Sequence, residues 1–302
     1  MTSPLVIAVT GATGFVGKIT LLKLLEAGHK VQALVRTPAK VRSIQHPNLR
    51  WVKGALGENL SDFVKGADIV LHIAGAIKGR VRSDYFEVNA KGTRLLAKQA
   101  QMAGVKRFVL LSSIAARQSQ LSDYAASKHA GEIALKEEFT GKVAIVRAPP
   151  VFGPGDEATR PFFEAADKGF LPVPGGKNWR LRKLSLIYVD DLADCLSIDA
   201  IQGAYDGKVL SPATLGSITW PDFAVQCRQA LGHPVKLISI PKSLLYGLAG
   251  ATSLTSRFLG RGHLTLGKLR EFLYEDWSSD DSLYEATPIK DALIATLQAY
   301  RA

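Results

Sequence analysis

Cysteine is scarce in this chain. Only two of its 302 residues are cysteines, Cys195 and Cys227, and they lie far apart in the sequence. So few cysteines exclude a disulfide framework, and their spacing matches no metal-binding motif. We therefore expect two buried thiols in a protein of a reducing compartment, and no bound metal ion.

Long apolar runs are absent as well. The longest notable run, residues 243–256, has fourteen residues, which suits a core or interfacial helix and is too short to span a bilayer. No cation precedes Lys18, and the apolar run before it has the pattern of a strand, so a signal peptide is not expected. These features predict a cytoplasmic protein, with peripheral attachment to the inner membrane left open.

Acidic residues are fewer than basic ones. The chain has 27 Asp and Glu against 38 Lys and Arg, which gives a net charge of +11 and a pI of about 9.6. Nucleic acid is not an expected partner, because the cations are scattered and no nucleic-acid-binding motif occurs. A solubilising surface with a basic cofactor pocket is the first explanation, and a membrane surface or acidic lipid is the second.

The most informative stretch that is present is LVIAVTGATGFVG, residues 5–17. A short apolar run precedes Gly11, Gly14 and Gly17, and apolar residues at helical spacing follow until Gly28. The glycines thus lie on a strand-to-helix turn, where backbone N–H groups and the positive end of the helix dipole favour an anion. Glycine also lets the backbone approach a phosphate closely. The turn predicts a nucleotide site, against the alternative of an ordinary tight turn.

Strands and helices alternate through the first half of the chain, which is 47% hydrophobic over its whole length and holds no repeat or low-complexity tract. This alternation predicts an α/β protein with a doubly wound parallel sheet, whose ligands bind beyond the carboxyl ends of the strands. The expected strands are residues 5–9, 31–35, 49–56, 67–75, 106–113 and 142–153, and the expected helices include 88–104 and 124–139.

The alternation breaks after Gly155. Residues 158–183 are rich in Pro, Gly and cations and look irregular, residues 184–201 resume a strand and a helix, and the last third is expected to be helical with loops. We predict a cofactor-binding domain and a smaller, mostly helical substrate-binding lid. Residues 1–155 and 186–215 are assigned to the first, and residues 156–185 and 216–302 to the second.

Tyr124 and Lys128 are four residues apart in an expected helix, which places them on one face. A nearby ammonium group lowers the pKa of a phenol from its ordinary value of about 10. The pair therefore suits proton transfer to or from the oxygen of a hydroxyl-bearing carbon. The alternative is a tyrosine on the helix surface beside a solvated lysine.

Three further polar residues are candidates. Ser112 and Ser113 end an expected strand, where a hydroxyl can hydrogen-bond a substrate carbonyl or simply cap a loop. Asn89 lies inside an expected helix, a mediocre position for asparagine, where it can hold a water in a proton relay or face solvent.

Several motifs follow one another in a fixed order. They are TGATGFVG, HIAG, VNAKGT, LLSS, YAASK, VRAPPVFGPGD and IYVDDLA, and they cover roughly residues 5–195. This ordered set resembles the extended short-chain dehydrogenase/reductase family, in its epimerase/dehydratase branch. The resemblance implies a Rossmann-type fold, a nicotinamide cofactor and an enzyme that acts on CH–OH or ketone groups.

The resemblance also implies roles for residues. Tyr124 would be the general acid/base, and Lys128 would bind the ribose and tune Tyr124. Ser113, rather than Ser112, would orient the substrate oxygen, and Asn89 would support a water relay. The expected cofactor contacts are Gly11, Thr13, Gly14, Phe15, Val16, Gly17, Arg36, His72, Ala74, Gly75, Ser112, Lys128, Pro150 and Val151.

The chain departs from the family pattern at three points. The sequence Gly54-Ala55-Leu56 lacks the Asp that often contacts adenine, Phe152 replaces a tyrosine, and the segment between Ser113 and Tyr124 is short. None of these departures removes a catalytic group.

The end of the second expected strand bears on the choice of cofactor. An acidic residue there would hydrogen-bond the ribose 2′-hydroxyl of NAD, but this chain has Arg36. A guanidinium group pairs well with a 2′-phosphate, so we expect NADP(H) in preference to NAD. The alternative is that Arg36 stacks on adenine and accepts both cofactors.

The substrate is the least determined feature. The cationic residues 177–183 suit a sugar-nucleotide diphosphate or anionic lipid headgroups, whereas residues 161–174, 240–254 and 256–260 suggest an apolar ligand or an ordinary core. The leading hypothesis is NADPH-dependent reduction of a ketone on a hydrophobic substrate, a sterol or a 3-keto-sphingolipid such as ketoceramide. The alternatives are a sugar-nucleotide epimerase or dehydratase and a non-catalytic NADPH-binding structural subunit. A homodimer is expected from family habit alone.

Overall fold

The computed structural model describes residues 4–41, 44–247, 249, 265–279, 281–282 and 285–301. It divides into two compact units. Unit 1 comprises Met1–Ser119, Tyr124–Arg147 and Leu192–Leu210, and unit 2 comprises Gln120–Asp123, Ala148–Asp191 and Ser211–Ala302. The assignment of cofactor binding to one part and substrate binding to the other stays a prediction.

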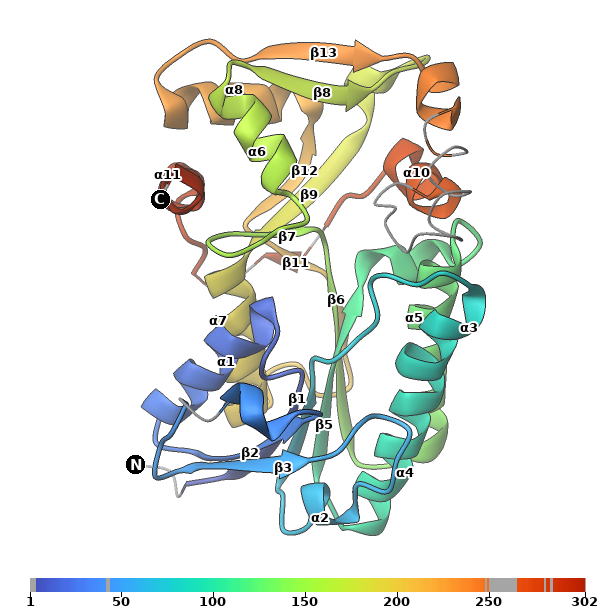
Figure 1. Cartoon of the computed structure of the whole chain (residues 1–302), viewed down its shortest axis with the longest axis vertical. Coiled ribbons are helices and arrows are strands. Elements are labelled where there is room, and N and C mark those ends of the chain that lie inside the picture. Colours follow the sequence, from blue (N-terminus) through green and yellow to red (C-terminus); the bar gives the residue numbers. More distant parts are fainter. Residues whose placement is uncertain are drawn as a thin grey trace. The chain divides into compact units, whose positions relative to one another are not determined.

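Unit 1 is built on a seven-stranded parallel sheet, as the alternation predicted (Figure 1). The inner strands β1, β4 and β5 are largely apolar and buried, because helices cover both faces of the sheet, whereas the edge strand β3 exposes Arg50 and Lys53. In sheet order the strands are β10 (Val209–Leu210), β6 (Lys142–Ala148), β5 (Arg107–Ser113), β4 (Ile69–His72), β1 (Val6–Thr10), β2 (Lys30–Val35) and β3 (Leu49–Lys53).

Helices on the two faces bury these strands (Figure 1). One face is covered by α1 (Phe15–Glu26) and α7 (Val189–Gln202), and the other by α4 (Thr93–Met102) and α5 (Asp123–Glu138). The core on the second face includes Leu96, Phe108, Leu135 and Ile145, which are almost fully buried. The shorter helices are η1 (Pro38–Val41), α2 (Ser61–Val64), α3 (Arg82–Phe86), η2 (Glu87–Gly92) and η3 (Ile114–Gln118).

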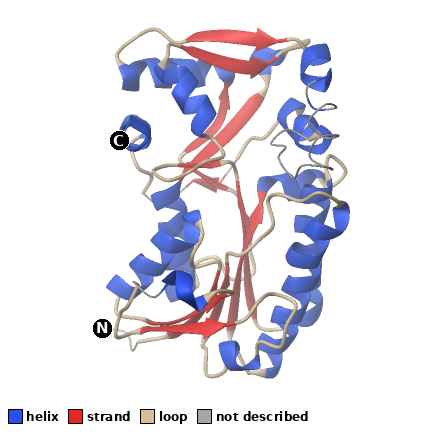
Figure 2. Cartoon of the chain, viewed as in Figure 1, coloured by secondary structure: helices blue, strands red, loops and turns tan. Residues whose placement is uncertain are grey.

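Unit 2 contains strands as well as helices (Figure 2). Its three small sheets are β8 (Phe170–Pro174) with β13 (Lys236–Ile240), β12 (Leu215–Thr219) with β9 (Lys183–Tyr188) and β7 (Val151–Phe152), and β11 (Pro212–Ala213) with β14 (Asp281–Ser282). Its helices include α6 (Arg160–Asp167), η4 (Trp179–Leu181), α8 (Trp220–Leu231), α10 (Leu266–Leu273) and α11 (Ile289–Arg301), and residues 242–247 are helical too.

The prediction that residues 158–183 are irregular was wrong, and the last third of the chain holds strands as well as the expected helices. Residues 158–183 contain α6, β8 and η4. Prolines are usually a sign of loops, but Pro172 and Pro174 lie in a strand of a two-stranded sheet, where proline is tolerated at an edge. The partner of that strand is β13, more than 60 residues later, so no local pattern reveals the pairing.

Two expectations on composition can be compared with the structure. Cys195 and Cys227 are buried and form no disulfide, as predicted, and burial raises the pKa of the Cys227 thiol to about 12. No helix in the described part of the chain is long and apolar enough to cross a bilayer. Part of the expected apolar segment 240–254, and all of the segment 256–260, lies outside the described residues, which omit 248 and 250–264.

Candidate active site

The glycine turn joins β1 to α1 and leaves no room for side chains. Gly11 has a φ of +75°, and a Cβ on it would lie 2.7 Å from the backbone nitrogen of Ala74. A Cβ on Gly17 would lie 2.1 Å from the carbonyl oxygen of Gly11. The Gly14 N–H donates to that same oxygen at 2.9 Å. The first turn of α1 therefore packs directly on the loop that precedes it, which only glycine permits.

The N-terminus of α1 is suited to an anion. Gly14 is the N-cap and supplies no side-chain cap, and the first turn of the helix holds no acidic residue. Thr13 and Gly14 are exposed, and Phe15 and Val16 are half-buried. The partial positive charge of the helix end is thus accessible to an anionic ligand, and the glycine turn fits the pyrophosphate of a dinucleotide.

We predict that Gly17→Ala lowers the free energy of unfolding by about 1–3 kcal/mol and weakens cofactor binding, because the added methyl group meets backbone that cannot move aside. Urea denaturation and a cofactor titration would measure the two effects. Gly247→Ala is the matched control, since nothing lies within 4 Å of its Cβ position. A Gly17→Ala protein that matched this control in both measurements would contradict the prediction.

Arg36 follows β2 directly. It is exposed and makes no hydrogen bond or ion pair with the described residues, so its guanidinium group is free to bind a ligand. Gly54, after the adjacent β3, packs against Leu34 and Leu60, and its N–H donates to the carbonyl of Val35 at 3.1 Å. The end of β2 thus carries a cation and no acid.

Tyr124 and Lys128 lie in α5, four residues apart as the spacing predicted. Tyr124 is half-buried, and its ring meets the edge of Tyr85 with 6.2 Å between ring centroids. Lys128 is buried, and its Nζ donates to the carbonyl of Leu111 at 3.0 Å. A Cβ on Gly75 would lie 2.9 Å from that Nζ, so glycine makes room for the ammonium group.

Burial lowers the pKa of Lys128 to about 8, and the carboxylate of Glu132 opposes that shift. The side chain therefore remains mainly cationic at neutral pH, although it lies in the interior. A cation held in this way favours the ionised form of a nearby phenol and can hydrogen-bond a ribose hydroxyl.

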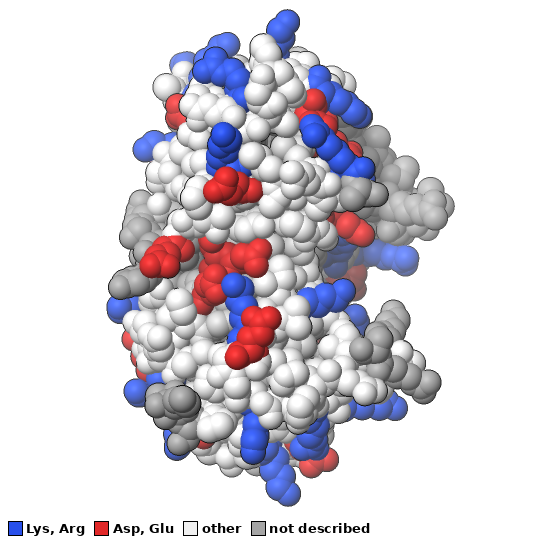
Figure 3. Space-filling model, turned by 90° about the vertical axis from the view of Figure 1, so that its left-hand side faces the viewer, with Lys and Arg blue, Asp and Glu red and all other residues white. Residues whose placement is uncertain are grey.

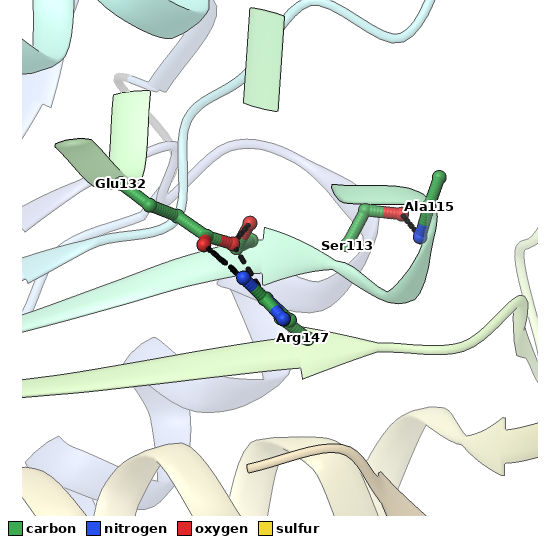
Figure 4. Close-up of polar contacts among 5 residues, drawn as sticks. Ser113, Ala115, Glu132 and Arg147 are labelled. Carbon is green, nitrogen blue, oxygen red and sulfur yellow. Dashed lines mark hydrogen bonds and ion pairs between the residues drawn. The ribbon is translucent and has the colours of Figure 1, made fainter. Parts of the chain in front are cut away.

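The two serines at the end of β5 differ in what they contact. Ser112 is buried and donates to Oε1 of Glu132 at 2.5 Å. Arg147 of β6 also pairs with this carboxylate, with Nη2 2.6 Å from Oε2 (Figure 4). Ser113 is half-buried, and its Oγ accepts from the N–H of Ala115 at 3.2 Å.

Ser113 is therefore the better candidate for a substrate oxygen. Among the described residues its hydroxyl donates no hydrogen bond, so the hydroxyl hydrogen is available. The structure gives the Ser112 side chain a different role from the predicted cofactor contact, because strand geometry turns alternate residues to opposite faces and Ser112 faces the buried ion pair.

Asn89 lies in η2, a π-helical turn, and its side chain is fully engaged. Nδ2 donates to the carbonyl of Ala76 and to Oγ of Ser127, both at 2.9 Å, and Oδ1 accepts from the N–H of Ala76 at 2.8 Å. Both amide hydrogens are used, and they tie the loop after β4 to α5, the helix that carries Tyr124. The support of a water relay by Asn89 stays a prediction.

His72 is the centre of a buried hydrogen-bond chain. Its Nδ1 lies 2.6 Å from Oγ1 of Thr10, and its Nε2 lies 3.0 Å from Oγ1 of Thr93. Thr93 donates its hydroxyl hydrogen to the carbonyl of Asn89 at 2.8 Å, so we assign the proton of His72 to Nε2 and let Thr10 donate to Nδ1. Thr10 then accepts from the N–H of Ala74 at 3.2 Å.

This chain of bonds keeps His72 away from solvent and neutral. Burial, with the nearby cation of Lys128, lowers the pKa of His72 to about 3. The imidazole therefore supports the loop of Ala74 and Gly75, which line the approach to the glycine turn, and its side chain is committed to Thr10 and Thr93 rather than to a cofactor. Neither threonine was singled out in the sequence.

Pro150 and Val151 belong to unit 2. The carbonyl of Pro150 accepts from the N–H of Ile187 at 3.1 Å, and Val151 pairs with Ile187 between β7 and β9. Phe152 is fully buried and stacks on Phe163 with 5.4 Å between ring centroids, which explains why a hydroxyl is dispensable there. The contact of Pro150 and Val151 with the cofactor stays a prediction.

The cationic residues 177–183 are not equivalent. Lys177 and Arg180 are exposed, whereas Arg182 is buried and donates to the carbonyls of Pro174 at 3.0 Å and Gly175 at 3.2 Å. Arg182 is thus a structural residue of unit 2. This corrects the expectation that the whole segment serves an anionic ligand.

Comparisons with known proteins agree with this geometry. The model of a family described as NAD(P)H-binding matches residues 11–149. A ceramide reductase of Caulobacter vibrioides is 35% identical over 98% of this chain and 95% of its own length. A UDP-glucose 4-epimerase of Vibrio cholerae is 27% identical over 98% of this chain and 97% of its own.

A solved structure extends the likeness to the fold. The UDP-N-acetylglucosamine 4-epimerase of Methanobrevibacter ruminantium M1 has a TM-score of 0.72 at 19% identity, over 100% of this chain and 99% of that one. The same family is indicated by the Rossmann-type sheet, by the glycine turn, by the Tyr124–Lys128 pair and by the relatives that match the chain from end to end. The chain is an NAD(P)-dependent enzyme that belongs to the extended short-chain dehydrogenase/reductase family, in its epimerase/dehydratase branch.

Proposed function

We propose that this protein is an NADPH-dependent reductase that converts a ketone on a lipid-like substrate, specifically a 3-keto-sphingolipid of the ketoceramide type, into a secondary alcohol. The observation that carries the proposal is the end-to-end likeness to the Caulobacter vibrioides protein named ceramide reductase. Sterol-type ketones are the alternative lipid substrates that should be assayed beside it.

Three side chains of unit 1 carry the chemistry in this proposal. When bound, NADPH supplies a hydride for the carbonyl carbon. Tyr124 donates its phenolic proton to the carbonyl oxygen, which becomes the hydroxyl of the product, and solvent returns a proton to the phenolate. Ser113 donates a hydrogen bond to the same oxygen as negative charge develops. Lys128 stabilises the phenolate by its positive charge.

Support for an apolar substrate comes from unit 2. Phe162, Trp220 and Phe272 form an aromatic cluster, with 5.8 Å between the ring centroids of Phe272 and each of the other two rings. Phe162 and Phe272 are only partly buried, so the cluster keeps some apolar surface for a ligand. Because Arg182 is engaged with backbone carbonyls, the same unit has one cation fewer for a sugar-nucleotide diphosphate.

A preference for NADPH is part of the proposal, and Arg36 is the residue that tests it. Arg36→Ala is expected to weaken NADPH binding by about 10- to 100-fold, the loss of a charge-assisted contact with the 2′-phosphate, and to leave NADH binding nearly unchanged. Titrations of each cofactor into both proteins would measure this. Equal losses for the two cofactors would instead indicate that Arg36 stacks on adenine.

A sugar-nucleotide epimerase is the second candidate, and the Vibrio cholerae UDP-glucose 4-epimerase favours it. The two functions differ in cofactor turnover. A reductase consumes NADPH stoichiometrically, whereas an epimerase returns its cofactor unchanged at the end of each cycle.

The deciding experiment mixes purified protein with NADPH, or NADH in parallel, and follows cofactor oxidation. One substrate is a detergent-dispersed 3-keto-sphingolipid and the other is a 4-keto sugar nucleotide. Oxidation of NADPH with the lipid alone is the expected result. Oxidation with the sugar nucleotide alone, or turnover of a UDP-sugar without net loss of cofactor, would overturn the proposal.

A further inference from the structure

The positive charge of the chain is concentrated in two stretches of unit 2. Residues 168–189 and 223–270 contain no Asp or Glu, yet they hold 12 of the 38 Lys and Arg residues. The rest of the chain has 26 Lys and Arg against 27 Asp and Glu, so it is nearly neutral. The net charge of +11 is therefore a property of these two stretches rather than of the whole surface.

The fold brings the two acid-free stretches together. One contains β8 and the other contains β13, and these strands pair in parallel, with Lys236 opposite Phe170 and Ile238 opposite Pro172. Beyond the strands, the N–H of Gly175 donates to the carbonyl of Ile240 at 2.8 Å. A Cβ on Gly176 would lie 2.5 Å from Cε of Lys242, so Lys177 and Lys242, which are far apart in the sequence, come near each other. We call the exposed side of this strand pair, with the segment 175–181 after β8 and the helix after β13, the β8–β13 surface.

One face of this strand pair packs on the helices of unit 2. Among the described residues, the other face is exposed at Ile238, whereas Ile240 on that face packs against a cluster of Leu245, Ala249 and Leu269. Leu171 and Val173 of β8 are fully buried, and α6 and α8 lie against this strand pair (Figure 1). Alternation in a strand then directs Phe170, Pro172 and Ile238 to the opposite side. Ile238 is 50% exposed there.

Apolar side chains stand out among the cations of this surface. Leu181 of η4 is 71% exposed and Leu244, in the helix that follows β13, is 54% exposed. Lys177, Lys236 and Lys242 are exposed around them. Figure 3 shows Lys and Arg side chains projecting at the end of unit 2 that carries these strands, with fewer acidic ones.

We propose that the β8–β13 surface, defined by Lys177, Leu181, Lys236, Ile238, Lys242 and Leu244, binds the face of an anionic lipid membrane. The cations would contact lipid phosphates, and the exposed leucine and isoleucine side chains would enter the boundary between headgroups and acyl chains. The enzyme would thus bind peripherally, without a membrane-spanning helix among its described residues.

Charge and apolar exposure together favour a membrane over a nucleic acid. Both ligands attract Lys and Arg. Single-stranded nucleic acids also stack their bases on exposed aromatic rings, and the affinity of a protein for duplex DNA depends mainly on its cations. The apolar groups that are most exposed here are aliphatic, Leu181, Ile238 and Leu244. Aliphatic side chains gain free energy from contact with acyl chains and little from contact with phosphates or bases.

The test measures binding of the purified full-length protein to vesicles of phosphatidylcholine, with and without phosphatidylglycerol. Two double variants change the surface, K177E/K236E and L181S/I238S. Their matched controls are K65E/K98E and M102S/I133S, which alter exposed residues of the same kinds in unit 1. Thermal unfolding of every variant checks that it is folded.

We expect the protein to bind anionic vesicles, and to do so more weakly at high salt. The variant K177E/K236E should bind at least about 20-fold more weakly, since each cation near such a surface contributes about a fivefold factor. The variant L181S/I238S should bind about tenfold more weakly. Both controls should bind as the parent protein does.

Three outcomes would overturn the proposal. They are the absence of binding to anionic vesicles, equal binding by the surface variants and their controls, and equal binding to vesicles with and without phosphatidylglycerol. A parallel titration with duplex DNA identifies a polyanion surface instead, if K177E/K236E weakens DNA binding and leaves vesicle binding unchanged.

Discussion

Replacing Tyr124 with Phe is expected to reduce the turnover number by about 10²- to 10⁴-fold, the usual contribution of a positioned general acid. The phenylalanine keeps the ring, which packs edge-on against Tyr85, and removes only the hydroxyl group. The Kd for NADPH should stay unchanged, because the glycine turn and Lys128 are untouched. Steady-state kinetics with the ketone substrate and a cofactor titration would separate the two quantities.

Tyr85→Phe is the matched control for this experiment. Tyr85 lies against Tyr124, and Tyr85→Phe removes the same group, a phenolic hydroxyl, from the neighbouring ring. Turnover should change little, because the hydroxyl of Tyr124 that donates the proton in our proposal is retained. If Tyr124→Phe retained the activity of the Tyr85→Phe protein, another group would have to supply the proton, and the assignment of Tyr124 would be wrong.

The second large effect is expected at Glu132. This carboxylate is buried, accepts from Ser112, and pairs with Arg147 through three hydrogen bonds of 2.9, 3.2 and 2.6 Å. Glu132→Ala leaves the guanidinium group of Arg147 without its partner in a mostly buried position. We predict that the free energy of unfolding falls by about 3–5 kcal/mol, as measured by urea denaturation.

An exposed ion pair of the same residue types provides the comparison. Arg160 and Glu164 pair across one turn of α6, with 49% and 41% of their side-chain surfaces exposed. Glu164→Ala should lower the free energy of unfolding by less than about 1 kcal/mol, because water screens the pair. Similar losses for Glu132→Ala and Glu164→Ala would show that burial does not strengthen the Glu132–Arg147 pair.

The carboxylate of Glu132 also affects the pH dependence of activity, because it influences the pKa of Lys128. Because Glu132 opposes the effect of burial, Glu132→Gln should lower the pKa of Lys128 further below about 8. Activity that requires the ammonium form would then decline at a lower pH than in the parent protein. In the parent, the unfolded chain binds more protons at Lys128 between pH 8 and 10.5, so this group makes the fold more stable as pH rises through that range.

Much of unit 1 could be predicted from local patterns. The apolar run, the three glycines and the helix that follows them form one contiguous strand–turn–helix unit, so their geometry depends on neighbours in the sequence. The spacing of Tyr124 and Lys128 likewise placed them on one helix face. Glu132 is a further four residues along α5, and the same spacing argument would have found it.

Tertiary structure decided which polar groups remain free for chemistry. Nothing local distinguishes Ser112 from Ser113, and the choice follows from Arg147 and Glu132, which approach one face of β5 from β6 and α5. Asn89 and Arg182 were candidates for ligand contacts, yet the fold supplies other partners for their donors. Asn89 donates to the carbonyl of Ala76 and to Oγ of Ser127, and Arg182 donates to two backbone carbonyls. A buried polar group must find a hydrogen-bond partner, and that partner can come from any part of the chain.

The sequence by itself determined the alternation of strands and helices, the glycine turn and the placing of Tyr124 and Lys128 on one helix face, because each depends on residues within a few positions of one another. Only the tertiary structure decided the pairing of β8 with β13, and with it the approach of cations from two acid-free stretches, such as Lys177 and Lys242. Strand pairing joins segments that are distant in the chain, so the charge of a surface is set by the fold and not by the order of residues.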